Sequence, residues 1–507
     1  MTNLEQIMNE SFEEDIRAAM NKWSVQGCAI VVTKGEEYKI ITLGKRDESE
    51  PVTCKTLFAL ASCSKLFTAL ALIRALTSEG LNVKTRIKTI LPDFKLYDKL
   101  AEEECTIEDM LSHRTGLPGY DPLWNPSYSL DDLPDRLSKL KPTLGFREGQ
   151  QYNSFLYDLA VLIIEKLTNQ HFEKYIQSEF FDPLGMESVT FEHDEEGKEY
   201  SKGFWKGFDP NAAQQEIQEE GKVEILDFGL RKLGERGGLG TGRLWINGDD
   251  LVKWLKALPD IPEYKQCIKP INVVGSSGGL EFPDHTILYG LAQRISTHRG
   301  VLVNEHSGEI PGFLSRISRL PKYNVGFAIL TNSDPGGKYL RSLVKCKLIE
   351  AFAGLEKLDW IEKIESIHQE HLDATRKWLS PSSSFSGNTI KGKSNDDPLI
   401  GTWKSEGFDT WEITPSSIVN KLPSLKSLPF IPALYGQVNY FFSPSNEKGK
   451  YHACFEWQLD SIDSKEIIYG YPFSVQLIDY DRIKVIGLMG VGEGLNEDDF
   501  GIIFERL

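Results

Sequence analysis

Apolar positions in the first part of the chain follow a helical period, then a strand-like one, then a helical one again. Residues 4–22 carry apolar side chains on one face at helical spacing and predict an amphipathic helix. Residues 27–33 and 38–44 are rich in β-branched residues and flank a short polar turn, so they predict a β-hairpin. Helical segments then dominate, and we predict them at 62–79, about 106–113, 154–168 and 171–179.

Strand-like segments return in the second half of the chain. Short runs rich in β-branched residues predict strands at 286–289, 300–304, 314–318 and 325–331. Further helices are predicted at 338–352 and about 358–378. Because strands flank a large helical middle, the pattern indicates an α+β domain. Its single antiparallel sheet would be built from both ends of the domain and flanked by helices.

The composition and the hydrophobic pattern of the chain change after residue 379. Residues 380–397 are rich in serine and read as a linker. Beyond them, short alternating segments are broken by Gly, Pro and Asn, which predicts a small all-β barrel or sandwich. We therefore divide the chain into a first domain (1–379), a linker (380–397) and a C-terminal all-β domain (398–507).

The composition is that of a globular protein of 507 residues with a net charge of −17. This acidic balance argues against nucleic acid and anionic membranes as partners. The seven cysteines are scattered and form no C-x-x-C pair, so we expect reduced thiols and no metal or cofactor. No signal peptide or membrane-spanning stretch is visible, and the sequence predicts a cytoplasmic protein.

The stretch around Ser62 carries the strongest chemical signal. An apolar run over 57–61 leads to this serine, and a helix rich in Ala and Leu follows it as far as Gly80. Lys65 lies one helical turn after Ser62, so the two side chains share a face of the helix. A charged lysine in so apolar a helix needs a partner or a purpose. We interpret the pair as a nucleophile with its general base.

The Ser-x-x-Lys spacing is a weak signal when it stands alone. The same spacing occurs at three other places, which are Ser138/Lys141, Ser342/Lys345 and Ser445/Lys448. For those three we favour a capped helix or a solvated loop. The apolar context on both sides distinguishes Ser62 from them.

Two further clusters carry polar side chains. Tyr152, Asn153 and Ser154 lie on a turn that opens the helix at 154, where a phenol and an amide could enter a site. Ordinary capping of that helix is the plainer alternative. The second cluster, from Glu305 to Gly312, follows a strand. Taken alone, it fits a hairpin turn with an incidental histidine.

Together, the three clusters resemble, in order and spacing, the three elements of the serine β-lactamase and penicillin-binding-protein family. The resemblance is closest to the class C-like esterase and D-aminopeptidase branch, and it covers roughly residues 10–350. Further landmarks agree with it at 111–118, 183–186, 237–239 and 289–291. It implies a β-lactamase/transpeptidase-like domain with a helical subdomain, followed by the small β-domain appended to many such proteins.

The resemblance also implies roles for the site residues. Ser62 would attack a carbonyl and form an acyl-enzyme, while Lys65 and Tyr152 would share the base and acid work. The backbone N–H groups of Ser62 and Glu309 would form the oxyanion hole. The other residues expected to contact substrate are Asn153, Ser154, His306, Ser307 and Gly308. The family's second element usually reads Tyr-x-Asn, whereas Ser154 holds the third position here, so either Asn153 or Ser154 takes that role.

The third element differs from that of penicillin-handling relatives, which usually carry Lys-Thr-Gly. Here it reads His306-Ser307-Gly308. A histidine with an ordinary pKa is mostly neutral at pH 7, which weakens the attraction for a substrate carboxylate. We therefore expect turnover of small uncharged esters or amides, with little penicillin hydrolysis.

A competing motif and competing functions stay open at this point. Residues 275–279 match G-x-S-x-G, the nucleophile elbow of α/β-hydrolases, but no helical period follows them. The candidate functions are a serine hydrolase, an acyltransferase or transesterase using the same acyl-enzyme, and a non-catalytic binding or scaffold protein. The presence of Ser62, Lys65 and Tyr152 argues against the last. The oligomeric state does not follow from the sequence.

Overall fold

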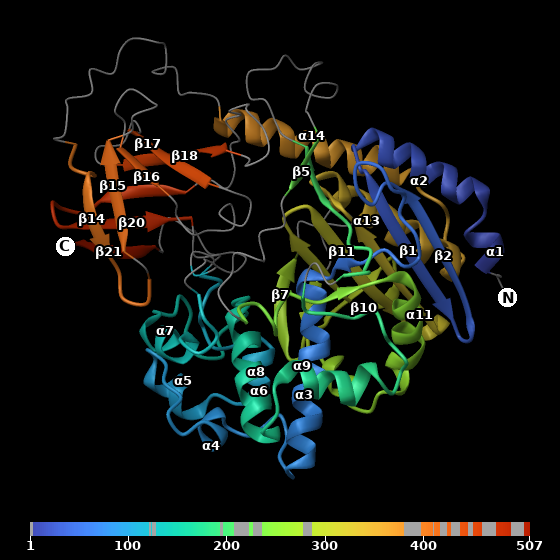
Figure 1. The fold of residues 1–507 in the computed structure, drawn as a ribbon, viewed down its shortest axis with the longest axis horizontal. Helices are drawn as coiled ribbons and strands as arrows, with labels where there is room; N and C mark the ends of the chain where they lie inside the picture. The colour runs from blue at the N-terminus through green and yellow to red at the C-terminus, as the bar shows by residue number, and fades with distance from the viewer. Residues whose placement is uncertain are drawn as a thin grey trace.

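The computed structural model shows a large α+β body and a β-barrel at opposite ends of the molecule (Figure 1). The chain begins in the body and ends in the barrel. The residues that the structure describes are 4–120, 123, 128–192, 196–206, 223–226, 236–276, 286–379, 397–408, 410–415, 423–426, 437–444, 450–458, 473–487 and 501–507.

The body is organised around an eight-stranded antiparallel sheet with the order β2-β1-β12-β11-β10-β9-β8-β7. Its strands are β1 (Gly27–Lys34), β2 (Glu37–Gly44), β7 (Asn272–Ser276), β8 (Thr286–Tyr289), β9 (Arg294–His298), β10 (Val301–Ile310), β11 (Phe313–Leu320) and β12 (Val325–Thr331). The N-terminal hairpin pairs with β12, where Ile30 lies opposite Ile329. Both ends of the domain therefore build one sheet, as the sequence predicted.

Helices cover both faces of this sheet (Figure 1). Successive strand residues point to opposite faces, so alternate residues of β1 enter two separate cores. Ile30 and Val32 pack with α2 (Glu10–Lys22), α13 (Gly336–Ala353) and α14 (Trp360–Leu379). Ala29 and Val31 belong to the second core, which includes α3 (Ser64–Ser78), α8 (Phe155–Thr168) and α11 (Gly248–Ala257).

The remaining helices build a helical subdomain and short connections. They are α1 (Leu4–Ile7), α4 (Ile87–Ile90), α5 (Lys99–Glu104), α6 (Ile107–Leu111), α7 (Leu133–Lys139), α9 (Phe172–Ile176) and α12 (Tyr264–Cys267). Short strands pair outside the main sheet: β3 (Phe58–Ala59) with β6 (Trp245–Ile246), and β4 (Gly203–Lys206) with β5 (Val223–Leu226) and β13 (Ser333–Asp334). Within the described residues, no helix is both long and apolar enough to cross a membrane.

The C-terminal part is a closed antiparallel barrel. Its strands are β14 (Gly401–Lys404), β15 (Trp411–Pro415), β16 (Pro423–Lys426), β17 (Gln437–Pro444), β18 (Lys450–Gln458), β19 (Ser474–Leu477), β20 (Arg482–Ile486) and β21 (Ile502–Arg506). Pairing of Trp403 with Arg506 closes the barrel. Of the two architectures that the sequence left open, the barrel is the one present. Residues 380–396 of the predicted linker lie outside the described residues.

The barrel rests on the helical subdomain. Phe408, in the turn between β14 and β15, lies with its ring centroid 5.8 Å from that of Tyr120. Trp403, Trp411 and Phe504 fill the barrel and belong to the same continuous apolar core as the helices beside the sheet. The α+β fold with an appended all-β domain, as predicted, is therefore confirmed.

Candidate active site

Ser62 lies where a short strand turns into the buried helix α3. Strand β3 leads to Leu60, whose N–H donates to the carbonyl of Leu244 at 2.8 Å. Ala61 then takes a left-handed conformation with φ of +47°, which costs an alanine about 1–2 kcal/mol. Strain of this kind gathers at functional sites. The sharp turn leaves Ser62 half-buried at the start of a 3-10 turn, where its N–H has no partner within the helix.

Lys65 is fully buried and points back at Ser62. Its Nζ donates to Ser62 Oγ at 3.0 Å and to the carbonyl of Thr241 at 3.2 Å. The same nitrogen lies 5.1 Å from the ring centroid of Tyr152 and 5.6 Å from that of Tyr157. The structure therefore brings the predicted nucleophile, base and tyrosine into one cluster.

The residues after Tyr152 divide into two kinds. Tyr152 is half-buried, and Ser154 is half-buried with no hydrogen bond from its hydroxyl to a described residue. Asn153 is fully buried, and its Nδ2 donates to the carbonyl of Pro118 at 2.6 Å. Its Oδ1 accepts from the N–H of Leu156 at 3.3 Å, so the amide of Asn153 is used to anchor the start of α8.

His113 belongs to the same cluster, and the sequence reasoning missed it. Its buried ring lies 4.4 Å from the ring of Tyr152 and 5.2 Å from that of Tyr289. Burial first, and then Lys65, hold the pKa of His113 well below its usual value. Its Nδ1 accepts from the N–H of Asn153 at 3.2 Å, so the neutral ring carries its proton on Nε2. The only sequence signal was its place in the landmark at 111–118.

Strand β10 brings the third cluster against the nucleophile turn. Cys63 directly follows Ser62 in the chain. Its thiol donates to the carbonyl of His306 at 3.1 Å. Gly308 leaves no room for a side chain, since an added Cβ would lie 2.1 Å from the carbonyl oxygen of Leu60. Glycine is therefore required for this close approach.

Among the described residues, the end of β10 has no pairing partner on the edge that follows Glu305. Residues 306–310 pair with β11, whereas pairing with β9 stops at Glu305. Every second N–H along such a segment faces the unpaired edge. Behind this edge, Arg341 donates to the carbonyl of Gly308 at 2.9 Å and pairs with the carboxylate of Glu309. These contacts hold the segment in place, so its free N–H groups are candidate donors to a substrate oxygen.

His306 is buried and uncharged. Burial, and then Arg294 and Lys65, hold its pKa well below the usual value. Its Nδ1 lies 2.7 Å from the carbonyl of Ser307, which can only accept, and its Nε2 lies 3.1 Å from the hydroxyl of Tyr289. In the neutral ring, Nδ1 therefore donates and Nε2 accepts. Both nitrogens of His306 are used within the protein, while Ser307 is half-buried with its hydroxyl unbonded among the described residues.

Arg294 is a second residue that the sequence reasoning missed. It is the first residue of β9 and lies opposite Glu305, at the point where the free edge of β10 begins. It is half-buried, makes no ion pair with a described residue, and lowers the pKa of both His306 and His113. The guanidinium of Arg294 therefore lies near the third element, His306-Ser307-Gly308, which has no lysine of its own. No sequence signal marked it, because β9 is short and largely polar.

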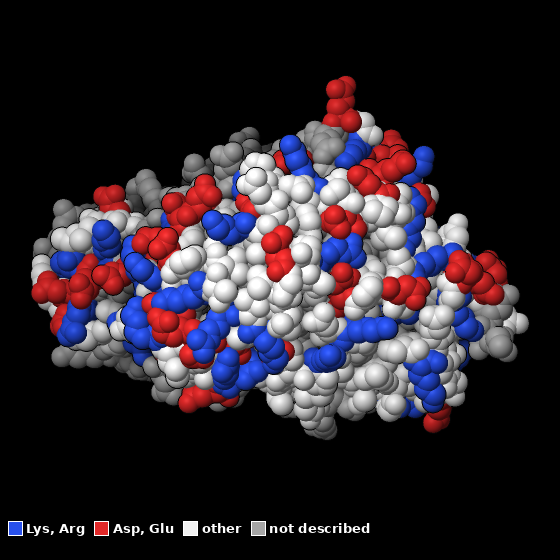
Figure 2. All heavy atoms as spheres, turned by 90° about the horizontal axis from the view of Figure 1, so that it is seen from below, with Lys and Arg blue, Asp and Glu red and all other residues white. Residues whose placement is uncertain are grey.

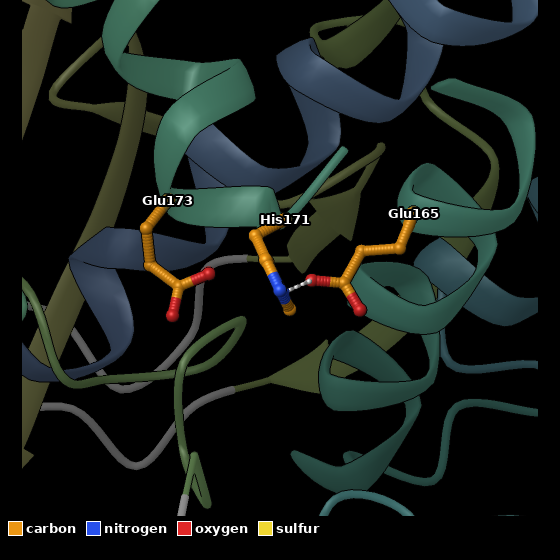
Figure 3. A group of neighbouring side chains, drawn as sticks. All are labelled: Glu165, His171 and Glu173. Carbon is orange, nitrogen blue, oxygen red and sulfur yellow. Dashed lines mark ion pairs between the residues drawn. The ribbon is translucent and has the colours of Figure 1, made fainter. Parts of the chain in front are cut away.

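Within the described residues, one group of His, Cys, Asp or Glu side chains has its ligand atoms close enough together to hold a metal ion. It consists of Glu165, His171 and Glu173, at the junction of α8 and α9 (Figure 3). Arg236 pairs with the carboxylates of both Glu165 and Glu173. Because a guanidinium already neutralises these carboxylates, we interpret the cluster as a helix junction held by ion pairs.

Two of the other Ser-x-x-Lys motifs lie within the described residues, and one residue of each makes a hydrogen bond away from its motif. Lys345 is buried on α13 with its Nζ 2.7 Å from a carboxylate oxygen of Glu305. The hydroxyl of Ser138 donates to the carbonyl of Asp135 at 2.6 Å. Ser445 and Lys448 lie outside the described residues, as does Ser277 of the G-x-S-x-G match. The first residues of that match end β7, an edge strand of an antiparallel sheet.

A half-buried serine hydrogen-bonded to a buried lysine, on an α+β fold with an antiparallel sheet, is the arrangement of a candidate serine hydrolase. The family model described as Beta-lactamase matches residues 12–344. The chain belongs to the beta-lactamase family.

Relatives and solved structures agree with this assignment. Unguisins hydrolase ungD' of Aspergillus campestris is 25% identical over 405 residues, covering 73% of this chain and 70% of the relative. Protein flp of Staphylococcus aureus is 24% identical over 354 residues, covering 68% and 66%.

Two solved structures share the fold. The octameric penicillin-binding protein homologue from Pyrococcus abyssi has a TM-score of 0.58 at 18% identity and covers 97% of this chain and 99% of its own. The D-amino acid amidase from Ochrobactrum anthropi SV3 has a TM-score of 0.54 at 21% identity and covers 68% of this chain and 99% of its own. Because the first likeness covers 97% of this chain, it includes the barrel as well as the α+β body.

Proposed function

We propose that this protein is a serine hydrolase that cleaves a small ester or amide through an acyl-enzyme on Ser62. The observation that carries the proposal is the 3.0 Å hydrogen bond between Ser62 Oγ and the Nζ of the fully buried Lys65. The names of the relatives, a hydrolase and an amidase, support an amide or ester substrate. On the face drawn in Figure 2, acidic and basic side chains are interspersed, which fits a small-molecule substrate better than a nucleic acid.

The proposed reaction has two steps. Ser62 Oγ bonds to the substrate carbonyl carbon while Lys65, acting as the general base, takes the hydroxyl proton through its Nζ, and the N–H groups of Ser62 and Glu309 stabilise the oxyanion. The bond to the leaving group then breaks, and the leaving group takes up the proton through Lys65 and Tyr152. Water repeats the sequence on the ester of Ser62 and releases the acid.

A fluorophosphonate probe tests the nucleophile directly. We expect a covalent adduct on the peptide containing Ser62, because an activated serine attacks phosphorus as it attacks a carbonyl. Ser62→Ala should lose both the adduct and turnover, while Ser342→Ala, from a buried Ser-x-x-Lys of α13, should keep both. An unlabelled wild-type protein, or an adduct that persists in Ser62→Ala, would contradict the proposal.

Arg294 changes the expected substrate preference. Its guanidinium replaces the cation that the third element lacks, and a charge pair at 4 Å is worth about 1–4 kcal/mol between aqueous and protein-surface dielectrics. We therefore expect Arg294→Gln to lower kcat/KM at least about tenfold for an ester that carries a carboxylate. The matched neutral ester should be unaffected, and Arg294→Lys should restore part of the loss. Equal losses on both esters would show that Arg294 does not bind substrate.

A further inference from the structure

The glycine-rich loop over 237–242 supplies the second partner of Lys65. The carbonyl of Thr241 accepts from Lys65 Nζ at 3.2 Å. Among the described residues, Lys65 donates hydrogen bonds to two groups, the hydroxyl of the nucleophile and this carbonyl. The position of the loop therefore sets the direction in which the amine points.

A single buried carboxylate on α8 holds this loop. Asp158 is fully buried, and its Oδ2 accepts from the N–H of Gly238 at 2.8 Å while its Oδ1 accepts from the N–H of Gly240 at 3.0 Å. The hydroxyl of Tyr128 donates to Oδ2 at 2.8 Å. Both carboxylate oxygens are thus used, two of the three bonds going to the backbone of the loop.

The loop is held just as closely on its other side. The hydroxyl of Thr68 on α3 donates to the carbonyl of Gly240 at 2.8 Å. An added Cβ on Gly240 would lie 2.0 Å from the carbonyl oxygen of Tyr157, so the loop backbone lies directly against α8. Because the loop is anchored one residue before Thr241, a shift of this anchor moves the carbonyl that orients Lys65.

We propose that Asp158 is a positioning residue for the catalytic lysine, acting through the backbone of Gly238–Thr241. This inference rests on the proposed role of Lys65 as the base for Ser62. An ionised Asp158 accepts three hydrogen bonds. In a protonated Asp158, the oxygen that carries the proton is a weaker acceptor, although Tyr128, Gly238 and Gly240 all still donate to the carboxyl group. The loop then loses a hydrogen bond, and the carbonyl of Thr241 no longer holds Lys65 in line with Ser62.

Asp158 changes its charge in a pH range where enzyme kinetics can be measured. Burial raises the pKa of Asp158 to about 6, even though the hydrogen bonds from Tyr128, Gly238 and Gly240 and the charge of Lys65 lower it. The ionisable groups that face it are the hydroxyl of Tyr128 and the amine of Lys65. Since this pKa lies above the unfolded value, the contribution of Asp158 to stability falls as pH rises from about 4 to 6. The rate should rise over the same interval, so a structural role and a positioning role predict opposite trends.

The test compares Asp158→Asn with the wild type by kcat, KM and the pH profile of kcat/KM. An amide oxygen can accept from one loop N–H, but the amide nitrogen faces the other donor. We expect kcat to fall about 10²-fold, as for a catalytic group misplaced by about 1 Å, with KM little changed. The acidic limb near pH 6 should vanish, because the variant has no carboxylate to titrate there.

Two further variants keep the test decisive. Asp250→Asn removes a similarly buried carboxylate on α11, which accepts from the N–H and hydroxyl of Ser188 at 2.7 and 2.6 Å. It should lower the melting temperature and leave kcat and the pH profile unchanged. Tyr128→Phe keeps both loop bonds but removes one bond that lowers the pKa of Asp158, so the acidic limb should move to higher pH.

The outcomes separate the two proposals. If the wild type labels with the fluorophosphonate but Asp158→Asn keeps its kcat and its acidic limb, the role of Asp158 is overturned and that of Ser62 stands. If Asp158→Asn does not fold, Tyr128→Phe decides. An acidic limb at the same pH in Tyr128→Phe as in the wild type also overturns the role of Asp158. A wild-type protein that does not label overturns the proposed function itself.

Discussion

Lys65→Met is expected to lower kcat/KM by about 10²–10⁴-fold, the range typical of losing a general base. The Nζ that contacts Ser62 at 3.0 Å is the basic group closest to the nucleophile in the described site. His113 and His306 do not replace it, because the bonds to Nδ1 of the first and to both ring nitrogens of the second are already made. The measurements are steady-state kinetics on a p-nitrophenyl ester and the rate of fluorophosphonate labelling.

Lys345→Met is a matched control for this variant. Lys345 occupies the last position of another Ser-x-x-Lys, on a helix, and is also nearly fully buried. Its partner is the carboxylate of Glu305, so its loss should destabilise the fold by breaking a buried pair. We expect Lys345→Met to lower the melting temperature while each folded molecule keeps its labelling rate. A labelling rate in Lys65→Met within a few-fold of wild type would remove Lys65 from the mechanism.

The contrast between these lysines shows what the sequence could establish. The apolar run before Ser62 and the apolar helix after it predicted that Lys65 is buried beside the serine, because local context determines burial in a continuous helix. The other partner of Lys65, the carbonyl of Thr241, lies 176 residues away in the chain. A backbone carbonyl has no residue-type signature, so neither Thr241 nor its support by Asp158 could be predicted.

Asn153 and Ser154 illustrate the same limit at short range. The swap of residue types in the second element was visible, and the sequence left open which side chain serves the site. What the sequence could not show is the contact with Pro118, which lies in a separate loop. The carbonyl of Pro118 accepts a hydrogen bond from the side-chain amide of Asn153. The hydroxyl of Ser154 makes no hydrogen bond to a described residue, so we expect Ser154 rather than Asn153 to take the role facing the substrate.

The elements that the sequence reasoning missed have weak periodic signals. Helix α11 begins with Gly248 and two aspartates, a composition more typical of a turn, and it is stabilised by the side chain of Asn247 at its N-cap. Strand β9 has the sequence Arg-Ile-Ser-Thr-His, so four of its five residues are polar and its apolar signal is weak. The helix predicted at about 106–113 ends at Leu111, since His113 takes a φ of +61°.

Gly308→Ala is the second change for which we expect a large effect. The new Cβ would lie 2.1 Å from the carbonyl oxygen of Leu60, 2.4 Å from the hydroxyl of Ser315 and 3.1 Å from the Cβ of Ala61. Backbone cannot yield as a flexible side chain can, so β10 and the turn that carries Ser62 must move apart. Because the two proposed oxyanion donors lie on opposite sides of this contact, their spacing would change directly.

We expect Gly308→Ala to lower kcat/KM by about 10²-fold, the cost of a misplacement of about 1 Å, and to destabilise the fold by about 1–3 kcal/mol through overpacking. Gly326→Ala is the control, because the nearest atoms to its added Cβ, in the same sheet, are side-chain atoms of Thr33, Leu255 and Arg319 at 3.1–3.5 Å. It should keep the labelling rate of Ser62. The discriminating measurement is that rate per folded molecule, since overpacking alone lowers stability without slowing acylation. If folded Gly308→Ala labels as fast as Gly326→Ala, the oxyanion hole does not span the contact between β10 and the nucleophile turn, and the donors must be sought elsewhere on the edge of β10.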